Sequence, residues 1–373
     1  MIGGRRLNWS EKLADSIMAR TPYLYQDKGY ERKWSYDYGV VLKGFQLLWL
    51  KTKEKKYLDF IQTNIDYFVQ EDGSIKGYKL EEYNIDHINT GKLFFILYKE
   101  TGDEKYRKAA ENCAKQLSNH PRTSEGVFWH KAIYPWQIWL DGLYMGAPFY
   151  AEFIQTFTPK KDYQDVLRQF EISYQRLFDS KTNLLFHAWD EKMKQPWADL
   201  ETGLSHHFWS RSIGWYLMAC VDTYELLHKE VDCRLLGQIV TSTLEALLPY
   251  QSETGTWYQV TTETKRKGNY LEASGSSMFV YAMAKGIRLG ILEKEVWFPQ
   301  LKKSYQGLFD EFVLETKEGW LNLNKNCQVA GLGGADQRDG SYAYYISEPI
   351  VCNDQKGVGA FLQALVEVEG VSR

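Results

Sequence analysis

The segment Trp-Leu-Asp-Gly-Leu-Tyr-Met-Gly at residues 139–146 is the most informative one for the fold, and it continues as a mostly apolar stretch to residue 154. Its residues are apolar on nearly every face, which is typical of a helix that is buried on all sides. Residues 91–98 and 213–227 have the same character. Glycines within these segments allow neighbouring helices to approach closely. The sequence therefore predicts a set of buried helices that contain glycine.

Amphipathic helices are predicted between the buried ones. Apolar residues recur at steps of three and four in residues 57–69, 106–117, 166–178, 235–248 and 305–312, with a shorter stretch at 9–17. That spacing places one apolar stripe on each helix. The turn that follows, as in Glu-Asp-Gly-Ser-Ile at 71–75, returns at intervals of about 50 to 70 residues. A unit of two helices cannot bury its own apolar surface, so the units must stack.

Six such pairs predict an all-α (α/α)6 barrel, a closed ring with the buried helices inside and the amphipathic helices outside. We expect a single domain over residues 1–373, because no linker rich in Ser, Gly or Pro and no block of charge divides the chain. Ten glycines then fall on the inner helices, where the crowded centre favours a missing side chain: Gly39, Gly44, Gly91, Gly142, Gly146, Gly214, Gly275, Gly286, Gly357 and Gly359.

Composition restricts the classes of function. The chain has 373 residues and a formal net charge of -3, so it lacks the basic excess that a nucleic acid or an anionic membrane would require. No apolar run approaches the roughly 20 residues of a membrane-spanning helix, and the N-terminus lacks the pattern of a secretory signal. We expect a cytoplasmic or periplasmic protein of open oligomeric state. The five cysteines are expected to be reduced core thiols.

The predicted ring would bring the ends of its inner helices into one cavity. The residues at those ends include Tyr36, Asp86, Asp141, Trp209 and Arg211. Loops rich in Trp, Tyr and His lie near them in the chain. Aromatic faces stack on pyranose rings, while carboxylates and guanidinium groups give directional partners to sugar hydroxyls. The pattern therefore predicts a carbohydrate site.

Simpler roles for these residues compete with a catalytic one. Asp86 and Asp141 each stand at a predicted helix start, where aspartate also serves as an N-cap. His187 could equally be a structural histidine of the core. A proton donor needs a raised pKa, which burial of Asp141 among aromatic residues would favour. No nucleophile elbow, phosphate loop or metal-ligand spacing is present, so neither a metal nor a cofactor is expected.

Four segments, in the same order, resemble those of glycoside hydrolase family 105, the unsaturated glucuronyl and rhamnogalacturonyl hydrolases. They are Arg-Thr-Ser-Glu-Gly-Val-Phe-Trp-His-Lys at 122–131, Tyr-Pro-Trp-Gln-Ile-Trp-Leu-Asp-Gly-Leu-Tyr-Met-Gly-Ala-Pro-Phe at 134–149, Phe-His-Ala-Trp-Asp-Glu at 186–191 and Phe-Trp-Ser-Arg-Ser-Ile-Gly-Trp-Tyr at 208–216. The resemblance covers essentially the whole chain. It implies an (α/α)6 barrel without a metal or an organic cofactor.

The resemblance also implies roles for individual residues. By motif match, Asp141 is the general acid and base, and Asp86 is the second carboxylate of the site. The residues expected to line the sugar pocket are Tyr36, from its place at an inner-helix end, and, by motif match, His130, Trp139, Met145, His187, Trp209, Arg211 and Trp215. Two stretches depart from the family pattern: residues 34–40, which contain Asp37, and residues 322–348.

The implied reaction is hydration of the C4=C5 bond of a 4,5-unsaturated uronic acid, at the non-reducing end of an oligosaccharide made by a polysaccharide lyase. It releases a keto acid and the adjoining sugar, expected to be a rhamnose from rhamnogalacturonan or from a sulfated polysaccharide such as ulvan. Two alternatives stay open. A conventional inverting glycosidase would use Asp86 and Asp141 as separate acid and base. A sugar-binding toroid without catalysis would keep the aromatic residues and tolerate the loss of Asp141.

Overall fold

A computed structural model describes residues 8–372 and shows two concentric sets of helices. The inner set consists of α2 (Tyr36–Thr52), the 3₁₀ turn η3 (Ile85–Gly91) with α4 (Lys92–Thr101), α6 (Leu140–Phe157), α8 (Ser210–Leu227), α10 (Ala273–Arg288) and α13 (Gln355–Val371). The outer set consists of α1 (Trp9–Arg20), α3 (Lys55–Asp66), α5 (Glu104–Asn119), α7 (Gln164–Leu177), α9 (Arg234–Leu247) and α11 (Lys294–Phe312).

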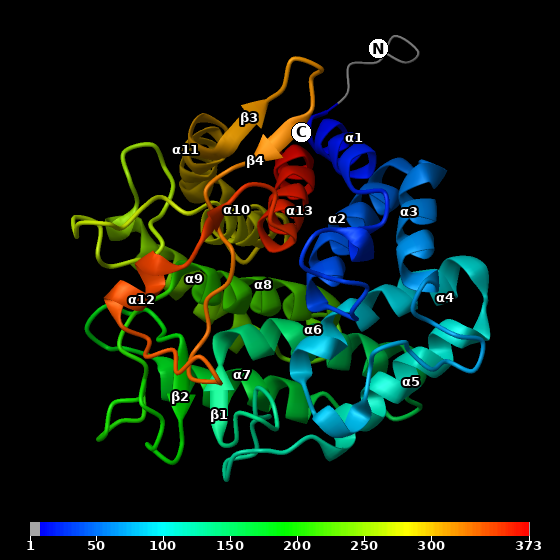
Figure 1. Cartoon of the computed structure of the whole chain (residues 1–373), viewed down its shortest axis with the longest axis horizontal. Coiled ribbons are helices and arrows are strands. Elements are labelled where there is room, and N and C mark those ends of the chain that lie inside the picture. Colours follow the sequence, from blue (N-terminus) through cyan, green and yellow to red (C-terminus); the bar gives the residue numbers. More distant parts are fainter. Residues whose placement is uncertain (1–7, 373) are drawn as a thin grey trace.

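The inner helices form a closed ring. Each contacts the next in chain order, and α13 contacts both α10 and α2. Each outer helix packs on an inner one, and α1, the first described helix, lies beside α13 (Figure 1). The predicted (α/α)6 barrel is therefore confirmed. No helix among residues 8–372 is both long and apolar enough to cross a bilayer.

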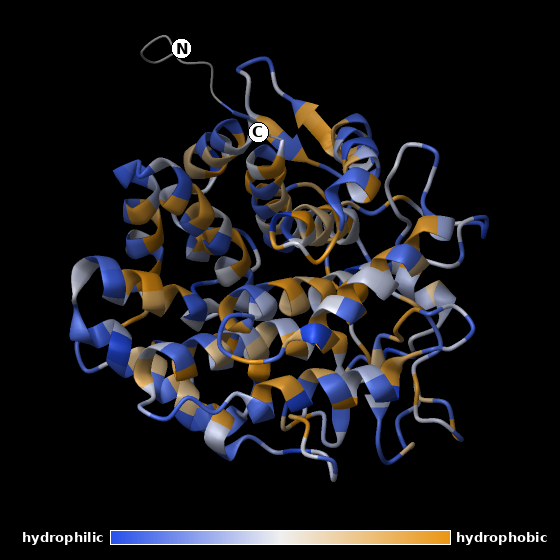
Figure 2. Cartoon of the chain, turned by 180° about the vertical axis from the view of Figure 1, so that it is seen from behind, coloured by the Kyte–Doolittle hydropathy of each residue, from blue (hydrophilic) through white to orange (hydrophobic). Residues whose placement is uncertain are grey.

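The two classes of helix differ in burial as the sequence predicts. In α8 and α10 nearly every residue is buried, whereas α5 buries only one stripe, which includes Tyr106, Ala109 and Cys113. The outer helices accordingly show separate hydrophilic and hydrophobic sides in Figure 2. All five cysteines are free, and four are buried as expected, but Cys352 is exposed. Cys352 lies in the short connection before α13, outside the helical core.

Gly359 marks a close approach of two inner helices. A Cβ atom added to it would lie 2.6 Å from backbone atoms of Val40 and Val41 on α2. Contacts this short do not occur, so α2 and α13 would have to separate. Gly275 of α10 has a similar relation to α8, because an added Cβ would lie 2.9 Å from the Ser210 carbonyl carbon. The missing side chains thus set the diameter of the inner ring.

We expect Gly359→Ala to lower the free energy of unfolding by about 1–3 kcal/mol, because overpacking forces the backbone to move. Gly370→Ala is a matched control on the same helix, since an added Cβ there has nothing within 4 Å. It should change stability by less than about 1 kcal/mol. Urea denaturation of both variants measures the difference. Equal stabilities would contradict the close packing of α2 on α13.

Short strands and loops cover one end of the barrel. The three two-stranded pairs are β1 (Gln137–Trp139) with β2 (Ala188–Asp190), β3 (Val313–Glu315) with β4 (Leu321–Leu323), and β5 (Asn326–Cys327) with β6 (Ile350–Val351), all antiparallel. The remaining elements are the 3₁₀ turns η1 (Leu24–Gln26), η2 (Leu80–Glu82) and η4 (Leu248–Tyr250) and the short helix α12 (Tyr342–Ser347). Residues of these short elements and loops, among them Trp139, Trp209 and Tyr345, form a second apolar cluster, separate from the main core.

Candidate active site

Neither of the two predicted catalytic aspartates caps its helix. Asp86 lies within η3, whose N-cap is Asn84, and the Asn84 side chain accepts a hydrogen bond from the Asp86 N–H. Asp141 is the second residue of α6, and no side chain caps that helix. Both carboxyl groups are buried. Capping therefore explains neither residue, although the dipole of each first turn still favours negative charge there.

Two cationic or ionisable neighbours hold the Asp86 carboxylate. Lys131 Nζ lies 2.6 Å from Oδ2, and His130 Nε2 lies 3.5 Å from Oδ1. Burial acts to raise the pKa of Asp86, but Lys131 and His130 outweigh it, so this pKa lies below its usual value. Burial lowers the pKa of His130 to about 4, which leaves its ring neutral at pH 7. Asp86 is thus a fixed anion with one ammonium group beside it.

We expect Lys131→Met to raise the pKa of Asp86. Without the ammonium group, burial becomes the dominant influence and favours the protonated form. In the wild type the group should stay ionised as the pH falls below the usual range of an aspartate, whereas in the variant it should take up its proton at higher pH. Titration of the Asp86 carboxyl carbon by NMR measures this. Lys55→Met, on the exposed face of α3, should leave the titration unchanged; an unchanged titration in Lys131→Met would contradict the assignment.

Pairing of β1 with β2 brings Asp141 next to His187. Trp139 pairs with Ala188, and the Leu140 N–H donates to the His187 carbonyl at 3.0 Å. As a result His187 Nε2 lies 3.3 Å from Asp141 Oδ2. Both atoms are buried, and neither has a well-aligned hydrogen-bond partner among the described residues. The contact places a carboxyl group against an imidazole, away from bulk water.

His130 joins the two aspartates into one site. Its ring interacts electrostatically with Asp86, Asp141 and His187, so all four groups lie at the same end of the barrel. They come from η3, from α6 and from the loops before β1 and β2. The structure therefore brings together the two carboxyl groups and the two histidines that the sequence singled out.

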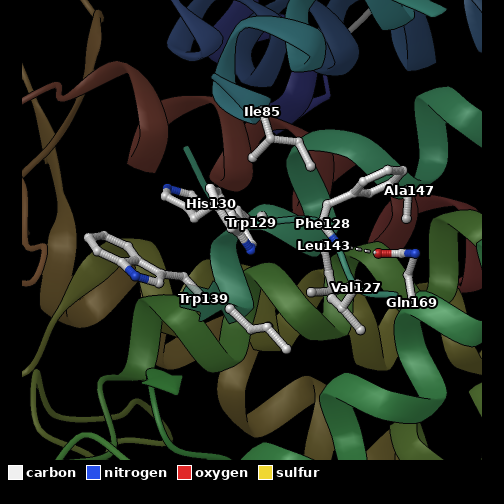
Figure 3. Close-up of a pocket in the computed structure, with 11 residues that line it drawn as sticks. Ile85, Val127, Phe128, Trp129, His130, Trp139, Leu143, Ala147 and Gln169 are labelled. Carbon is white, nitrogen blue, oxygen red and sulfur yellow. Dashed lines mark hydrogen bonds between the residues drawn. The ribbon is translucent and has the colours of Figure 1, made fainter. Parts of the chain in front are cut away.

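Aromatic rings surround these polar groups. His130 stacks on Trp139 with ring centroids 4.5 Å apart, and Trp139 meets His187 edge-on at 5.4 Å. Trp209 lies 4.8 Å from His187. A void of about 10 Å³ is lined by His130, Trp139 and Ile85 (Figure 3). It has room for about one water molecule. It is too small for a sugar, so these rings form a wall of the site.

A larger cavity of about 950 Å³ opens beside this cluster. Tyr36 lines it and also interacts electrostatically with Asp86. The Tyr36 ring meets Trp215 edge-on at 6.4 Å, and Trp215 stacks on Tyr144 at 4.8 Å. Tyr36 is therefore the boundary between the open cavity and the aspartates. Met145, one turn after Asp141 on α6, is buried in the core.

Arg211 is enclosed by protein groups. Its guanidinium donates to Ser274 Oγ at 2.6 Å and to the carbonyls of Cys327 and Gln328, and it lies 3.6 Å from the Glu272 carboxylate. The side chain is only 1% exposed. The guanidinium group thus joins α8 to α10, to β5 and to the residue after β5. Arg211 therefore supports the wall of the site.

Asp37, the unexpected acid of the first inner helix, has an internal cation. Lys356 Nζ lies 2.9 Å from Asp37 and 3.0 Å from Asp354, and all three side chains line the large cavity. Burial acts to raise the pKa of Asp37, but Lys356 outweighs it and the pKa is lowered. Burial raises the pKa of Asp354 above its usual value. The wall of the large cavity formed by Asp37, Lys356 and Asp354 therefore offers both hydrogen-bond donors and acceptors.

Sequence reasoning missed two polar residues of the site. Lys131 directly follows His130 in the segment 122–131. Because His130 was predicted to line the sugar pocket, its neighbour Lys131 could have been predicted as well. Tyr345, whose hydroxyl lies 2.7 Å from His187 Nδ1, gave no signal, because it belongs to a distant and unassigned stretch. Within residues 8–372, no three His, Cys, Asp or Glu side chains are grouped so as to hold a metal ion.

Comparison with known proteins gives consistent similarities. The model of Glycosyl Hydrolase Family 88 matches residues 9–371. The structure of a family 105 glycoside hydrolase from C. acetobutylicum ATCC 824 is 54% identical, covers 98% of this chain and 100% of that one, and superposes with a TM-score of 0.93. Protein Atu3128 of Agrobacterium fabrum is 36% identical over 230 residues, 60% of this chain and 97% of that protein. The unsaturated rhamnogalacturonyl hydrolase YesR of Bacillus subtilis is 27% identical over 263 residues, 69% of this chain and 72% of its own.

Proposed function

The chain belongs to Glycosyl Hydrolase Family 88 and, with its family 105 relative, is a glycoside hydrolase; from this premise we propose that it hydrates 4,5-unsaturated uronic acids at the non-reducing end of lyase products. The observation that carries the proposal is the pair of buried carboxyl groups at neighbouring inner-helix starts. Asp86 has a cation beside it, whereas the nearest ionisable partner of Asp141 is an imidazole. The similarity to YesR supports the same reaction class.

The proposed reaction begins with transfer of a proton from the Asp141 carboxyl group to C4. The C4=C5 bond is a vinyl ether through the ring oxygen, so the positive charge that forms at C5 is shared with that oxygen. Water adds to C5 and returns a proton to the Asp141 carboxylate. The resulting hemiketal opens to a ketone at C5, which leaves C1 as a hemiacetal, and the hemiacetal collapses to an aldehyde and releases the adjoining sugar. One residue thus performs the acid and the base steps, with the net addition of one water molecule.

Asp86 has a different role in this proposal. Its lowered pKa keeps it anionic, so it is unsuited to donate the proton and suited to stabilise the positive charge at C5. Its free lone pairs can also accept hydrogen bonds from sugar hydroxyls. The Trp139 and Trp209 rings lie against His187, the neighbour of Asp141. These positions support electrostatic stabilisation by Asp86 and proton transfer by Asp141.

We further propose that the adjoining sugar is a rhamnose, from rhamnogalacturonan or from a sulfated polysaccharide such as ulvan. The name of the similar YesR protein supports the first source. The large cavity lined by Asp37, Lys356 and Asp354 would receive this sugar. A panel of unsaturated disaccharides, with rhamnose, sulfated rhamnose or an amino sugar after the uronate, tests the assignment by kcat/KM. Turnover confined to the amino-sugar substrates would refute the rhamnose proposal.

The same proposal separates hydration from conventional hydrolysis. We expect turnover of the unsaturated disaccharide and none of its saturated counterpart. In heavy water, deuterium should enter C4 during turnover, and oxygen from labelled water should enter at C5 and not at C1. Preformed product kept in the same solvent corrects for later exchange. Cleavage of the saturated substrate, or early oxygen label at C1, would instead favour an inverting glycosidase that uses Asp86 as its base.

A further inference from the structure

The stretch 322–348, which departs from the family pattern, reaches the Asp141 end of the site through Tyr345. This residue of α12 is fully buried, with its ring 6.0 Å from His187 and 6.2 Å from Trp209. Its hydroxyl oxygen lies 2.7 Å from His187 Nδ1. On the other side of the same imidazole, Nε2 lies 3.3 Å from Asp141 Oδ2. Tyr345, His187 and Asp141 therefore form one continuous chain of polar contacts.

Burial determines the direction of the first contact. Among the described residues, His187 Nδ1 is the hydrogen-bond partner that the Tyr345 hydroxyl has. If the hydroxyl accepted a proton from Nδ1, its own proton would be buried without an acceptor, which costs about 1–3 kcal/mol. Burial also raises the pKa of Tyr345 well above its usual value, so the hydroxyl keeps its proton. The hydroxyl therefore donates to Nδ1.

The tautomer of His187 follows from this direction. A neutral imidazole carries one proton, so a ring that accepts at Nδ1 carries its N–H at Nε2. That N–H faces Asp141 Oδ2, and both atoms are buried without another partner among residues 8–372. The contact between the His187 Nε2–H and Asp141 Oδ2 is imperfectly aligned, as is common for catalytic hydrogen bonds before substrate binds.

One oxygen of Asp141 is thereby reserved for His187. Oδ2 is buried, whereas the side chain as a whole keeps 13% of its surface exposed, so Oδ1 is the oxygen left on the accessible side. An oxygen that accepts an N–H cannot also carry a proton in the same direction. The acid proton of Asp141 must then reside on Oδ1.

We propose that Tyr345 is a positioning residue whose hydroxyl holds His187 as the Nε2–H tautomer, which places the acid proton of Asp141 on Oδ1. The proposal rests on the function proposed above for Asp141. Oδ1 gives its proton to C4 and recovers one from the attacking water. Between these two steps Asp141 is a carboxylate, which the His187 N–H stabilises. Without the hydroxyl, Nε2 is free to accept the Asp141 proton at the buried oxygen Oδ2.

The test is Tyr345→Phe, which keeps the ring and removes only the hydroxyl. We expect kcat on an unsaturated disaccharide to fall roughly ten- to hundredfold, the range found when a group that orients a metal-bound histidine is lost, with KM little changed. Tyr342→Phe is the matched control on α12. The Tyr342 hydroxyl donates to the carbonyls of Arg266 and Lys267, away from His187, so its loss should leave kcat unchanged.

Nitrogen NMR of protein labelled in its histidine rings reports the tautomer without any substrate. The His187 signals are assigned by their absence in His187→Gln. The wild type and Tyr342→Phe should show protonated Nε2 and bare Nδ1, and Tyr345→Phe should lose this pattern. A wild type protonated at Nδ1 would overturn the proposal, even if Tyr345→Phe fails to fold.

Activity and tautomer together distinguish the possible failures. If the expected tautomer is present but Tyr345→Phe keeps kcat within twofold, the positioning role is refuted. If wild type turns over no unsaturated uronide, the proposed function fails, whereas the spectra still show which ring nitrogen carries the proton. A fall in kcat of equal size in Tyr342→Phe would assign the effect to packing of α12 and would likewise reject the role.

Discussion

Asp141→Asn is expected to lower kcat on an unsaturated disaccharide by roughly 10²–10⁴-fold, the range of general acid and base catalysis. This corresponds to about 3–5 kcal/mol of transition-state stabilisation. The amide has the size and shape of the carboxyl group, so the contacts with His187 and the surrounding rings are largely kept. It cannot deliver a proton to C4 or take one from water. KM should therefore change little.

Steady-state kinetics, with substrate binding measured by calorimetry, check this result. Asp232→Asn makes the same chemical change at an exposed residue that pairs with Arg234, and it should leave kcat unaltered. Asp86→Asn should also reduce kcat, because it removes an anion that stabilises the charge at C5. Near-normal turnover in Asp141→Asn would assign the acid to another group.

Glu272→Ala is expected to destabilise the fold by about 3–5 kcal/mol, the cost of removing one partner from a buried ion pair. The Glu272 carboxylate is fully buried beside Arg211. It accepts hydrogen bonds from the N–H groups of Ser274, Gly275 and Cys327. Its loss would leave the Arg211 guanidinium without its carboxylate and the start of α10 without its cap.

The free energy of unfolding in urea measures this effect. Glu293→Ala is a matched control, because Glu293 also occupies an N-cap position, that of α11, but makes no side-chain cap bond. It should cost less than about 0.5 kcal/mol. Glu272→Gln keeps the size and one acceptor oxygen, so its cost should fall between the two. A value for Glu272→Ala close to that of Glu293→Ala would contradict the buried pair.

This second prediction changes the expected role of Arg211. The sequence motif places this residue in the sugar pocket, and the structure gives its guanidinium protein partners on both sides. Such a residue affects the reaction by holding α8, α10 and the loop after β5 in register. Loss of activity in an Arg211 variant should therefore be accompanied by loss of stability, whereas Asp141→Asn should remain as stable as the wild type.

The repeating pattern was sufficient to predict the barrel, because helix periodicity is local. Each amphipathic stretch, such as residues 106–117, indicates which face of its helix is buried. Each stretch that is apolar on nearly every face, such as 143–154, predicts a helix with no exposed face. Glycines in the buried helices indicated close contacts between helices, and Gly359 is needed where α13 packs on α2. Two alternating classes of helix leave a closed double ring as the arrangement that buries both.

The motifs likewise predicted most of the candidate site, although not the state of its groups. Asp86 and Asp141 were found from their places at inner-helix starts, where a ring must bring them close. Their capping role could not be judged from sequence, since it depends on where each side chain turns. The short strands β1 and β2 were not predicted, because three residues carry too little pattern. Their pairing is what sets His187 beside Asp141.

The helical repeat, the barrel and the choice of Asp86 and Asp141 as candidates follow from local sequence, because each depends on residues within one or two turns of chain. The surroundings of these groups are visible in the folded chain alone: Lys131 beside Asp86, Glu272 beside Arg211 and Tyr345 behind His187. These pairs join separate loops and helix ends, which meet only when the ring closes. Since burial and neighbouring charges set proton affinity, the chemistry of each group follows from that closure.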